Sequence, residues 1–157
     1  MPTAQQGLTV SLSGDDTIQI NNQVLSTLAN QDPGHVTFPN ELAAVEQGKN
    51  GTTIYAQNPM GNVADLMIRL LLAGIDDQYI NSLLQEQQTA FSDFPLMTCL
   101  FNKRVGDGNG NILTVQYQLS GGVFSKGVEV MTSARGDVNQ SVAVWPLRFG
   151  NWQRLIV

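Results

Sequence analysis

One stretch of the sequence changes its hydrophobic period half-way along, and this change limits the possible folds more than any other feature. Between residues 63 and 72, leucine and isoleucine alternate with other side chains, as in a β-strand with one buried face. After Gly74 the spacing becomes helical, and Ile80, Leu83 and Leu84 fall on one side of the helix. This narrow apolar stripe predicts core contacts at those three positions. The sequence therefore predicts a strand that leads directly into a single helix, which covers a sheet.

The two ends of the predicted helix carry their own signals. Asp76 is expected to cap the helix by accepting backbone N–H groups of the first turn. Asp77 adds negative charge where the helix dipole favours it. Gln87 and Phe91 continue the inward side towards the C-terminal end of the helix. We therefore expect a helix that starts after Gly74 and packs inward as far as Phe91.

The composition favours a protein that meets copies of itself. The chain has 157 residues, which we expect to form one domain spanning residues 1–157. Charged residues make up only 13%, about half of the usual share, and Asn, Gln, Ser, Thr and Gly take their place. A neutral, hydrogen-bonding surface suits repeated self-association better than an isolated monomer. The net charge of −5 and the scattered basic residues argue against a dedicated nucleic-acid-binding protein.

The sequence contains one cysteine, and no segment has the pattern of a signal peptide or a membrane span. Cys99 lies in the apolar run PLMTCLF, where a small buried residue is a better interpretation than a nucleophile. The N-terminus lacks the basic and apolar regions of a signal peptide. No apolar run approaches the roughly 20 residues of a membrane span. We therefore expect a protein made in the cytosol that has no membrane contact.

The rest of the chain has the pattern of strands separated by turns. The expected strands are residues 8–12, 17–25, 35–38, 52–57, 95–105, 112–119, 126–132 and 139–149. Residues 40–47 are open to two interpretations, a single helical turn or a loop, because Gly48-Lys49-Asn50-Gly51 ends them at once. Gly121-Gly122 is expected to end the strand before it. Seven to nine strands and one helix predict a mainly β fold, in which two packed antiparallel sheets (a β-sandwich or barrel) are flanked by one α-helix.

No group of residues makes a convincing active site or metal site. The run from Asp107 to Asn111 begins like a calcium loop, but Ile112 stands where the turn needs Gly and Gln118 where the last carboxylate should be. It is therefore interpreted as a hairpin loop. His35 is the only histidine and lies beside a Pro-Gly turn, and the sequence contains no G-x-S-x-G motif that would supply a nucleophilic serine for it. We expect no enzymatic activity, no cofactor and no metal.

Four segments, taken in their order along the chain, have the residue pattern of a known family. They are GKNGTTIYAQNP, VADLMIRLLLAG, IDDQYINSLLQEQQ and QSVAVWPLRFGN. With them the chain resembles the tail tube proteins of contractile-tailed bacteriophages and, more remotely, the tube protein of type VI secretion. The resemblance covers roughly residues 48–151. It rests mainly on G-K-N-G-T, the acidic D-D start of the helix, and the pair GGVFSK…GD…AVW, while the first 47 residues fit as the hairpin expected before the barrel.

The resemblance implies a structural role in a virion tail that is assembled in the host cytoplasm. Tail tube proteins look like two packed β-sheets with one covering helix. Six of them close into a ring whose inner sheets join in one barrel, and the rings stack into a tube. Implied partners are further copies of the chain, the tail sheath, the baseplate and the tail terminator. Viral DNA would pass through the tube without sequence-specific binding. Ring closure also removes exposed sheet edges, which are otherwise aggregation sites.

Three residues are candidates for facing the bore of such a tube. Asp65, Gln116 and Glu129 lie on the non-leucine faces of expected strands, and a water-filled bore tolerates charges and amides. Asp65 has Arg69 on the same face as a possible charge partner, so Glu129 ranks first. An acidic or polar bore repels phosphates and lets DNA slide, whereas a basic one would hold them.

Two other functions compete with the tube subunit. One is a monomeric β-sandwich that binds a small ligand or a glycan, with Trp145, Trp152 and Tyr55 as its exposed aromatic residues. The other is a secretion-system tube or a baseplate subunit, which the sequence does not separate from a phage tail tube. Rings or tubes in the electron microscope would distinguish the assembly subunits from the monomeric binding module.

Overall fold

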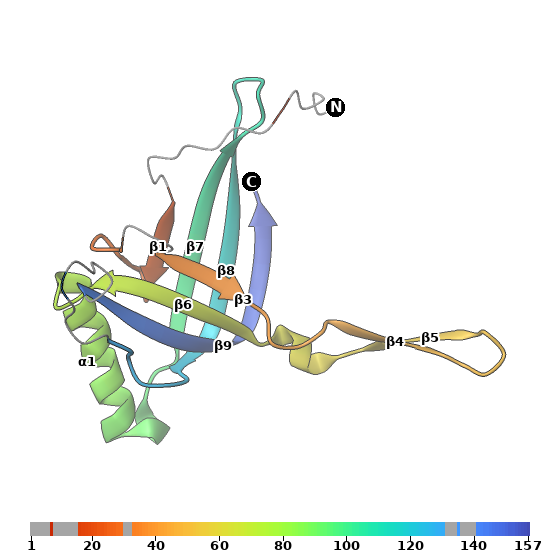
Figure 1. Cartoon of the computed structure of the whole chain (residues 1–157), viewed down its shortest axis with the longest axis horizontal. Helices are drawn as coiled ribbons and strands as arrows, with labels where there is room; N and C mark the ends of the chain where they lie inside the picture. The colour runs from red at the N-terminus through yellow and green to blue at the C-terminus, as the bar shows by residue number, and fades with distance from the viewer. Residues whose placement is uncertain (1–6, 8–15, 30–32, 131–134, 136–140) are drawn as a thin grey trace.

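The structure, a computed structural model, describes residues 7, 16–29, 33–130, 135 and 141–157 (Figure 1), so the predicted strand 8–12 lies outside the described residues. The fold class is confirmed: the described chain is mainly β, with two antiparallel sheets and one α-helix. Its elements are β1 (Thr17–Ile20), β2 (Gln23–Val24), β3 (Gly34–Thr37), β4 (Ala43–Gln47), β5 (Thr53–Gln57), the 3₁₀ turn η1 (Pro59–Asn62), β6 (Ala64–Leu71), α1 (Ile75–Thr89), the 3₁₀ turn η2 (Phe91–Asp93), β7 (Met97–Gly106), β8 (Ile112–Phe124) and β9 (Val142–Ile156).

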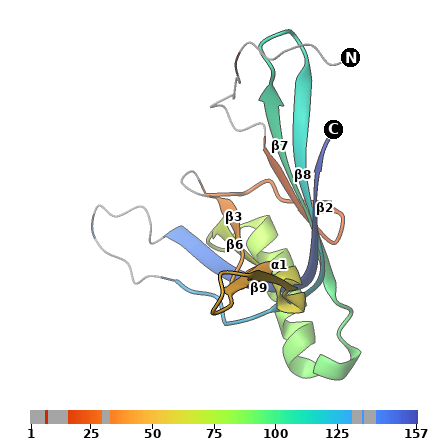
Figure 2. The same cartoon turned by 90° about the vertical axis from the view of Figure 1, so that its right-hand side faces the viewer.

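The two packed layers are the two halves of one bent sheet. Seven strands pair in the order β2-β1-β7-β8-β9-β6-β3, and all pairs are antiparallel. The long strand β9 belongs to both halves, because its residues 142–149 pair with β6 and its residues 147–156 pair with β8. Figure 1 shows β6 and β3 running across the upright strands β7 and β8, and Figure 2 shows β6 and β3 to one side of those strands. The core lies between the two halves and α1.

Glycines form the corner at which the sheet bends, and here one prediction is wrong. Gly121-Gly122 does not end its strand, since β8 continues to Phe124. Gly121 has a φ of 68°, which glycine adopts without steric cost, and the core side of β8 changes there from odd to even residues. At Gly122 a Cβ atom would lie 2.3 Å from the ring of Phe149, so only glycine leaves room for this buried ring. The glycine pair is therefore a packing site within a continuous strand.

The covering helix lies beside β6 and the lower end of β8, as Figure 1 shows. Ile80 and Leu83 are buried in the core, and Leu84 is partly buried against it. Gln87 also faces inward, where its side-chain oxygen accepts a hydrogen bond from the Phe124 backbone N–H at 2.9 Å. The expectation for Phe91 is wrong: the helix ends at Thr89, and Phe91 lies in η2 with its ring exposed.

The start of the helix also differs from the prediction. Gly74 is the N-cap residue and makes no side-chain capping bond, so Asp76 is not the cap. Asp76 lies in the first turn with 1% of its surface exposed, and its Oδ2 accepts hydrogen bonds from the backbone N–H groups of Ser26 and Thr27, both at 2.6 Å. The Thr27 hydroxyl donates to the same oxygen at 2.9 Å. The carboxylate therefore fixes a distant loop to the helix and does not close the helix end.

The segment before β3 is more broken than predicted. The expected strand 17–25 is two short strands, because Asn21 and Asn22 have φ values of 50° and 69° and form a tight turn between β1 and β2. Residues 27–29 then follow the edge of β6, where Leu28 forms a bridge with Leu70. Residues 27–29 and β3 therefore lie along neighbouring parts of the same edge of β6.

Most of the stretch 40–47 forms neither a helical turn nor a loop, and only residues 40–42 are irregular. Ala43–Gln47 is the strand β4, which pairs with β5 in an antiparallel hairpin. The Gly48-Lys49-Asn50-Gly51 run is its connecting turn, where Gly51 has a φ of 86°. Figure 1 shows this hairpin projecting sideways from the body of the protein. Residues 43–57 are called the arm below.

The remaining strand predictions are mostly confirmed. Strands occur at the expected places around residues 35–38, 52–57, 95–105 and 112–119. The expected strand 139–149 is β9, although it continues to Ile156 and its first residues, 139 and 140, lie outside the described part. The expected strand 126–132 is reduced to an isolated bridge between Glu129 and Val144, and residues 131 and 132 are not among those described.

Candidate functional site: a polar sheet face and a projecting arm

The three bore candidates lie in two different parts of the sheet. Gln116 is on β8, opposite Asn102 of β7 and Leu155 of β9. Asp65 is on β6, and Glu129 exchanges two backbone hydrogen bonds of 2.9 Å with Val144 of β9. The register puts Asp65 and Glu129 on the non-core side of the β6–β9 half, while Gln116 is on the non-core side of the other half.

Asp65 is engaged by a neighbouring strand. Its carboxylate oxygens accept hydrogen bonds from Arg148 Nε at 2.7 Å and Arg148 Nη2 at 3.2 Å. These bonds raise the pKa of the Arg148 guanidinium. Asp65 and Arg148 are directly opposite each other in the β6–β9 register. The charge partner that binds Asp65 is therefore this cross-strand arginine, while Arg69 lies on the same face of β6 as Asp65.

Neutral side chains that form hydrogen bonds line the non-core side of four adjacent strands. This surface, called the amide face, belongs to β1, β7, β8 and residues 150–156 of β9. Alternation and register assign to it Thr17, Gln19, Thr98, Leu100, Asn102, Arg104, Thr114, Gln116, Gln118, Ser120, Asn151, Gln153 and Leu155. Among these side chains, all in the described part of the chain, only Arg104 is charged. The amide face is therefore almost free of fixed charge.

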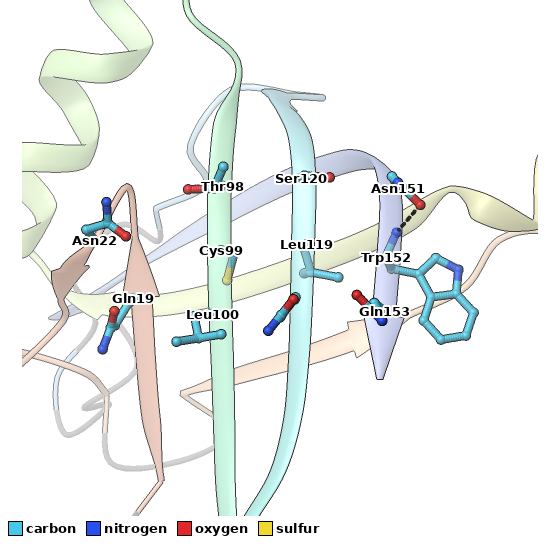
Figure 3. Close-up of a pocket in the computed structure, with 11 residues that line it drawn as sticks. Gln19, Asn22, Thr98, Cys99, Leu100, Leu119, Ser120, Asn151, Trp152 and Gln153 are labelled. Carbon is cyan, nitrogen blue, oxygen red and sulfur yellow. Dashed lines mark hydrogen bonds between the residues drawn. The ribbon is translucent and has the colours of Figure 1, made fainter. Parts of the chain in front are cut away.

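The amide face holds a shallow hollow of about 310 Å³. Figure 3 shows Gln19, Thr98, Ser120, Asn151 and Gln153 around it, from four neighbouring strands. Hydrogen bonds link some side chains of the face, such as Gln118 Nε2 to Gln116 Oε1 at 3.0 Å and Asn102 Nδ2 to Thr17 Oγ1 at 3.3 Å. None of the residues lining the hollow is ionisable apart from Cys99. The hollow offers hydrogen bonds but no charge to a ligand.

The half-sheet that carries the amide face has two edges. One is formed by the very short β2 beside β1. The other is the part of β9 from 150 to 156, whose outer side pairs with no strand among the described residues. An unpaired strand edge offers backbone N–H and C=O groups to another chain.

The root of the arm, which includes Leu42, Asn58 and Gly61, is held in place by Trp152 of β9. Trp152 donates a hydrogen bond from Nε1 to the Gly61 carbonyl at 2.9 Å, and its ring packs on Phe38 with centroids 4.6 Å apart. A Cβ atom on Gly61 would lie 2.8 Å from the Glu41 carbonyl, so glycine allows the chain to pass closely there. The Asn58 N–H donates to the Leu42 carbonyl at 2.9 Å and closes the base of the hairpin.

Beyond this root the arm is exposed to solvent. All residues of β4 and four of the five residues of β5 are exposed. Val45 and Tyr55 are cross-strand partners on one side of the arm, and Ile54 is on the other side. Tyr55 has 76% of its surface exposed. Apolar side chains exposed on both sides of a projecting hairpin are typical of a binding surface.

The glycan-binding interpretation loses two of its three aromatic residues. Trp145 is 1% exposed, and its Nε1 donates to Asp77 Oδ1 at 2.8 Å. Trp152 is half-buried at the root of the arm. Only Tyr55 of the three is exposed. A flat aromatic platform therefore cannot be formed from these three residues.

Two groups that could have carried chemistry are held in structural roles. The Asp107 carboxylate accepts hydrogen bonds from the Asn109 N–H at 2.8 Å, the Asn111 N–H at 3.2 Å and Asn111 Nδ2 at 3.1 Å. These bonds lower the pKa of Asp107. Burial raises the pKa of the Cys99 thiol to about 12. Within the described residues, no group of three or more His, Cys, Asp or Glu side chains could hold a metal ion.

Comparisons with solved structures relate the fold to contractile injection systems. No protein-family model matches the sequence, and no curated protein matches it significantly. The tube-terminating cap of the anti-feeding prophage is similar over 92% of this chain and 90% of that chain, with 7% identity and a TM-score of 0.60. A PVC sheath–tube complex in the extended state, from an extracellular contractile injection system, is similar over 90% and 88%, with 8% identity and a TM-score of 0.58.

At these identities the likeness shows the fold. The two structural neighbours named above are components of contractile injection systems. The sequence resembles tail tube proteins of contractile tails, so the two comparisons agree at the level of contractile systems. Among the described residues, no helix is long and apolar enough to cross a membrane. The sequence patterns did not reveal the arm or the extent of the amide face. Alternating Thr, Gln and Asn on three long strands was the signal that could have indicated that face.

Proposed function

We propose that this protein is a structural subunit of the hollow inner tube of a contractile phage tail, in which six copies close a ring and rings stack. The observation that carries the proposal is the amide face, a wide sheet surface with almost no charge and no covering element among the described residues. The shared fold with a tube cap and a sheath–tube complex supports it.

Ring closure would use the two edges of the half-sheet that carries the amide face. The free edge of β9 from 150 to 156 would meet the β1–β2 edge of the next copy, so that the half-sheets of six copies continue into one barrel. Closure of this kind satisfies backbone groups that a monomer leaves exposed. The amide faces of all six copies would then line the bore.

In this arrangement Gln116 is the bore candidate that we retain. Asp65 and Glu129 belong to the other half of the sheet, which in the same arrangement lies away from the bore. A neutral bore neither holds phosphates by counterion release nor repels them strongly. We propose that it carries viral DNA without specific binding, with a sheath around the tube and baseplate and terminator proteins at its ends.

Electron microscopy of the purified protein tests the assembly. We expect six-membered hollow rings that stack into tubes. Single rings that never stack would favour a cap or baseplate subunit, and a monomer of 17.0 kDa at high concentration would overturn the proposal.

Thiol labelling of assembled tubes tests the bore. Gln116→Cys in long tubes should react with a small maleimide but not with a maleimide attached to a large polymer, which cannot enter the bore. Glu129→Cys is the matched control and should react with both. Equal labelling of Gln116→Cys by both reagents would remove the amide face from the bore. Cys99 does not interfere, since its thiol is buried and its pKa is about 12.

A charge placed on the amide face tests the passage of DNA. Gln116→Lys adds six positive charges around a six-membered ring. In a phage carrying this protein, DNA ejection should slow at low salt and recover at high salt, because phosphate contacts weaken as salt rises. Unchanged ejection with normal tubes would argue against DNA as the cargo.

A further inference from the structure

The arm is a hairpin that is fixed at its base and exposed to solvent along both of its strands. Its base is fixed by the Trp152–Gly61 hydrogen bond, while residues 43–57 carry exposed apolar side chains on both sides. An isolated two-stranded hairpin is only marginally stable in water. The arm is therefore expected to reach its stable form only when another surface covers it.

A second apolar surface lies where β6 ends and α1 begins. It is called the helix-start patch and consists of Leu71, Leu72 and Ile75, of which Ile75 is 72% exposed. The patch is rigid, because the Leu71 N–H donates to the Thr27 carbonyl and the Leu72 N–H to the Ser141 carbonyl, at 2.9 and 2.8 Å. The three residues lie in or next to one tight turn, which the Gly74 N–H closes by donating to the Leu71 carbonyl at 3.1 Å. Exposed apolar residues gathered at such a turn are typical of a binding site for another apolar surface.

The arm and the patch lie at opposite ends of the molecule. Figure 1 is drawn with the longest axis horizontal, and it shows the arm at one side and the start of α1 at the other. A copy displaced along this axis would bring its helix-start patch towards the arm of the first copy. The two surfaces differ, so the contact is head-to-tail and leads to a closed ring or a filament.

We infer that the arm of one copy docks on the helix-start patch of the next copy, an inference that rests on the proposed function. Tyr55 and Val45, which are paired across the two strands, supply one apolar side of the arm, and Leu71, Leu72 and Ile75 receive it. The partner is thus a second copy of this chain. The contact is separate from the pairing of sheet edges and would fix the rotation of neighbouring copies.

Paired cysteines test the contact. In the variant Tyr55→Cys/Ile75→Cys, a short bifunctional maleimide should link each arm to the next patch and give a ladder of dimers, trimers and longer chains on a denaturing gel. Each single variant should remain monomeric on the same gel, because a head-to-tail contact never brings two identical positions together. Both residues are exposed, so melting temperatures should match wild type. Cys99 stays unreactive in its buried site.

A matched control uses another exposed position on the same helix. Gln85 lies ten residues after Ile75, which is about 15 Å along a helix. Tyr55→Cys/Gln85→Cys should therefore give no ladder. A dimer from Tyr55→Cys alone would mean that arms pack on arms, and a dimer from Ile75→Cys alone that patches pack on patches. Either result, or an equal ladder from the Gln85 control, overturns the inference.

Electron microscopy of the same samples separates this inference from the proposed function. Rings together with the ladder support both. Rings without a ladder leave the tube subunit standing and remove the arm–patch contact. A ladder without rings or tubes supports the contact and refutes the closed tube.

Discussion

Removal of the Asp76 carboxylate should destabilise the whole protein, although the residue lies outside the amide face and the arm. The side chain is 1% exposed, and its Oδ2 accepts three hydrogen bonds from Ser26 and Thr27 at 2.6–2.9 Å. It ties the loop before β3 to the first turn of α1. In Asp76→Ala, two backbone N–H groups and one hydroxyl of that loop lose their acceptor.

The size of the effect follows from these contacts. A hydrogen bond to a charged group contributes about 1.5–3 kcal/mol, and three bonds that share one oxygen are not additive. We expect Asp76→Ala to lower the free energy of unfolding by about 3–5 kcal/mol, a large part of the typical total of about 5–15 kcal/mol. Asp76→Asn keeps one accepting oxygen without the charge, so its loss should be about 1–2 kcal/mol.

Urea denaturation, with all variants in the same assembly state, measures these differences. Glu86→Gln on the exposed side of α1 is the control and should change stability by less than about 0.5 kcal/mol. Amide exchange gives a local measurement, since the N–H groups of Ser26, Thr27 and Leu71 should exchange faster in Asp76→Asn. A loss below about 1 kcal/mol for Asp76→Ala would falsify the assigned role of the carboxylate.

Three further predictions test the core, the corner and one loop. Leu83→Asp places an unpaired charge in the core, at a cost of several kcal/mol, and a soluble variant with wild-type melting temperature would exclude α1 from the core. Gly122→Ala brings a Cβ against the Phe149 ring and should cost about 1–3 kcal/mol in urea denaturation, whereas no loss would mean that the ring can move aside. The depressed pKa of Asp107 means that its stabilising bonds are complete above the ordinary value of 3.8 and are lost as pH falls through the lower folded value. Amide protection of Asn109 should drop in that acid range in wild type and not change with pH there in Asp107→Asn.

The strand–helix unit around α1 could be predicted because its partners are encoded within the same short stretch. Leu66, Ile68 and Leu70 alternate along β6, and Ile80 and Leu83 follow at helical spacing. All five are buried in one core, so each period records burial within the chain itself. The strand and helix boundaries agree with the pattern to within one or two residues.

The role of Asp76 could not be predicted from its position alone. A short acidic side chain at a helix start usually accepts N–H groups of its own helix, and the local sequence fits that rule. Here the acceptor serves Ser26 and Thr27, which are about fifty residues away in the sequence. Local propensity could give the chemistry of the residue, but only the fold could supply its partner.

The glycine pair at the corner shows a similar limit. Gly121-Gly122 was interpreted as a break because glycine weakens strands. In the structure the missing side chains are what allow the bend and the buried ring of Phe149. The sequence showed where the backbone is permissive, but it did not show that an aromatic ring from another strand fills the space.

The failure at β4 has a different cause, and it bears on function. Residues 43–47 read AAVEQ, which has no strand alternation, and alanine favours helices. Hydrophobic periodicity records which side of a strand is buried, but both sides of the arm are exposed within one copy. A strand whose burial is supplied by another molecule has no need of a one-sided pattern. The segment that the sequence leaves undetermined is therefore the segment whose partner we expect outside the chain, and the cysteine ladder tests that expectation directly.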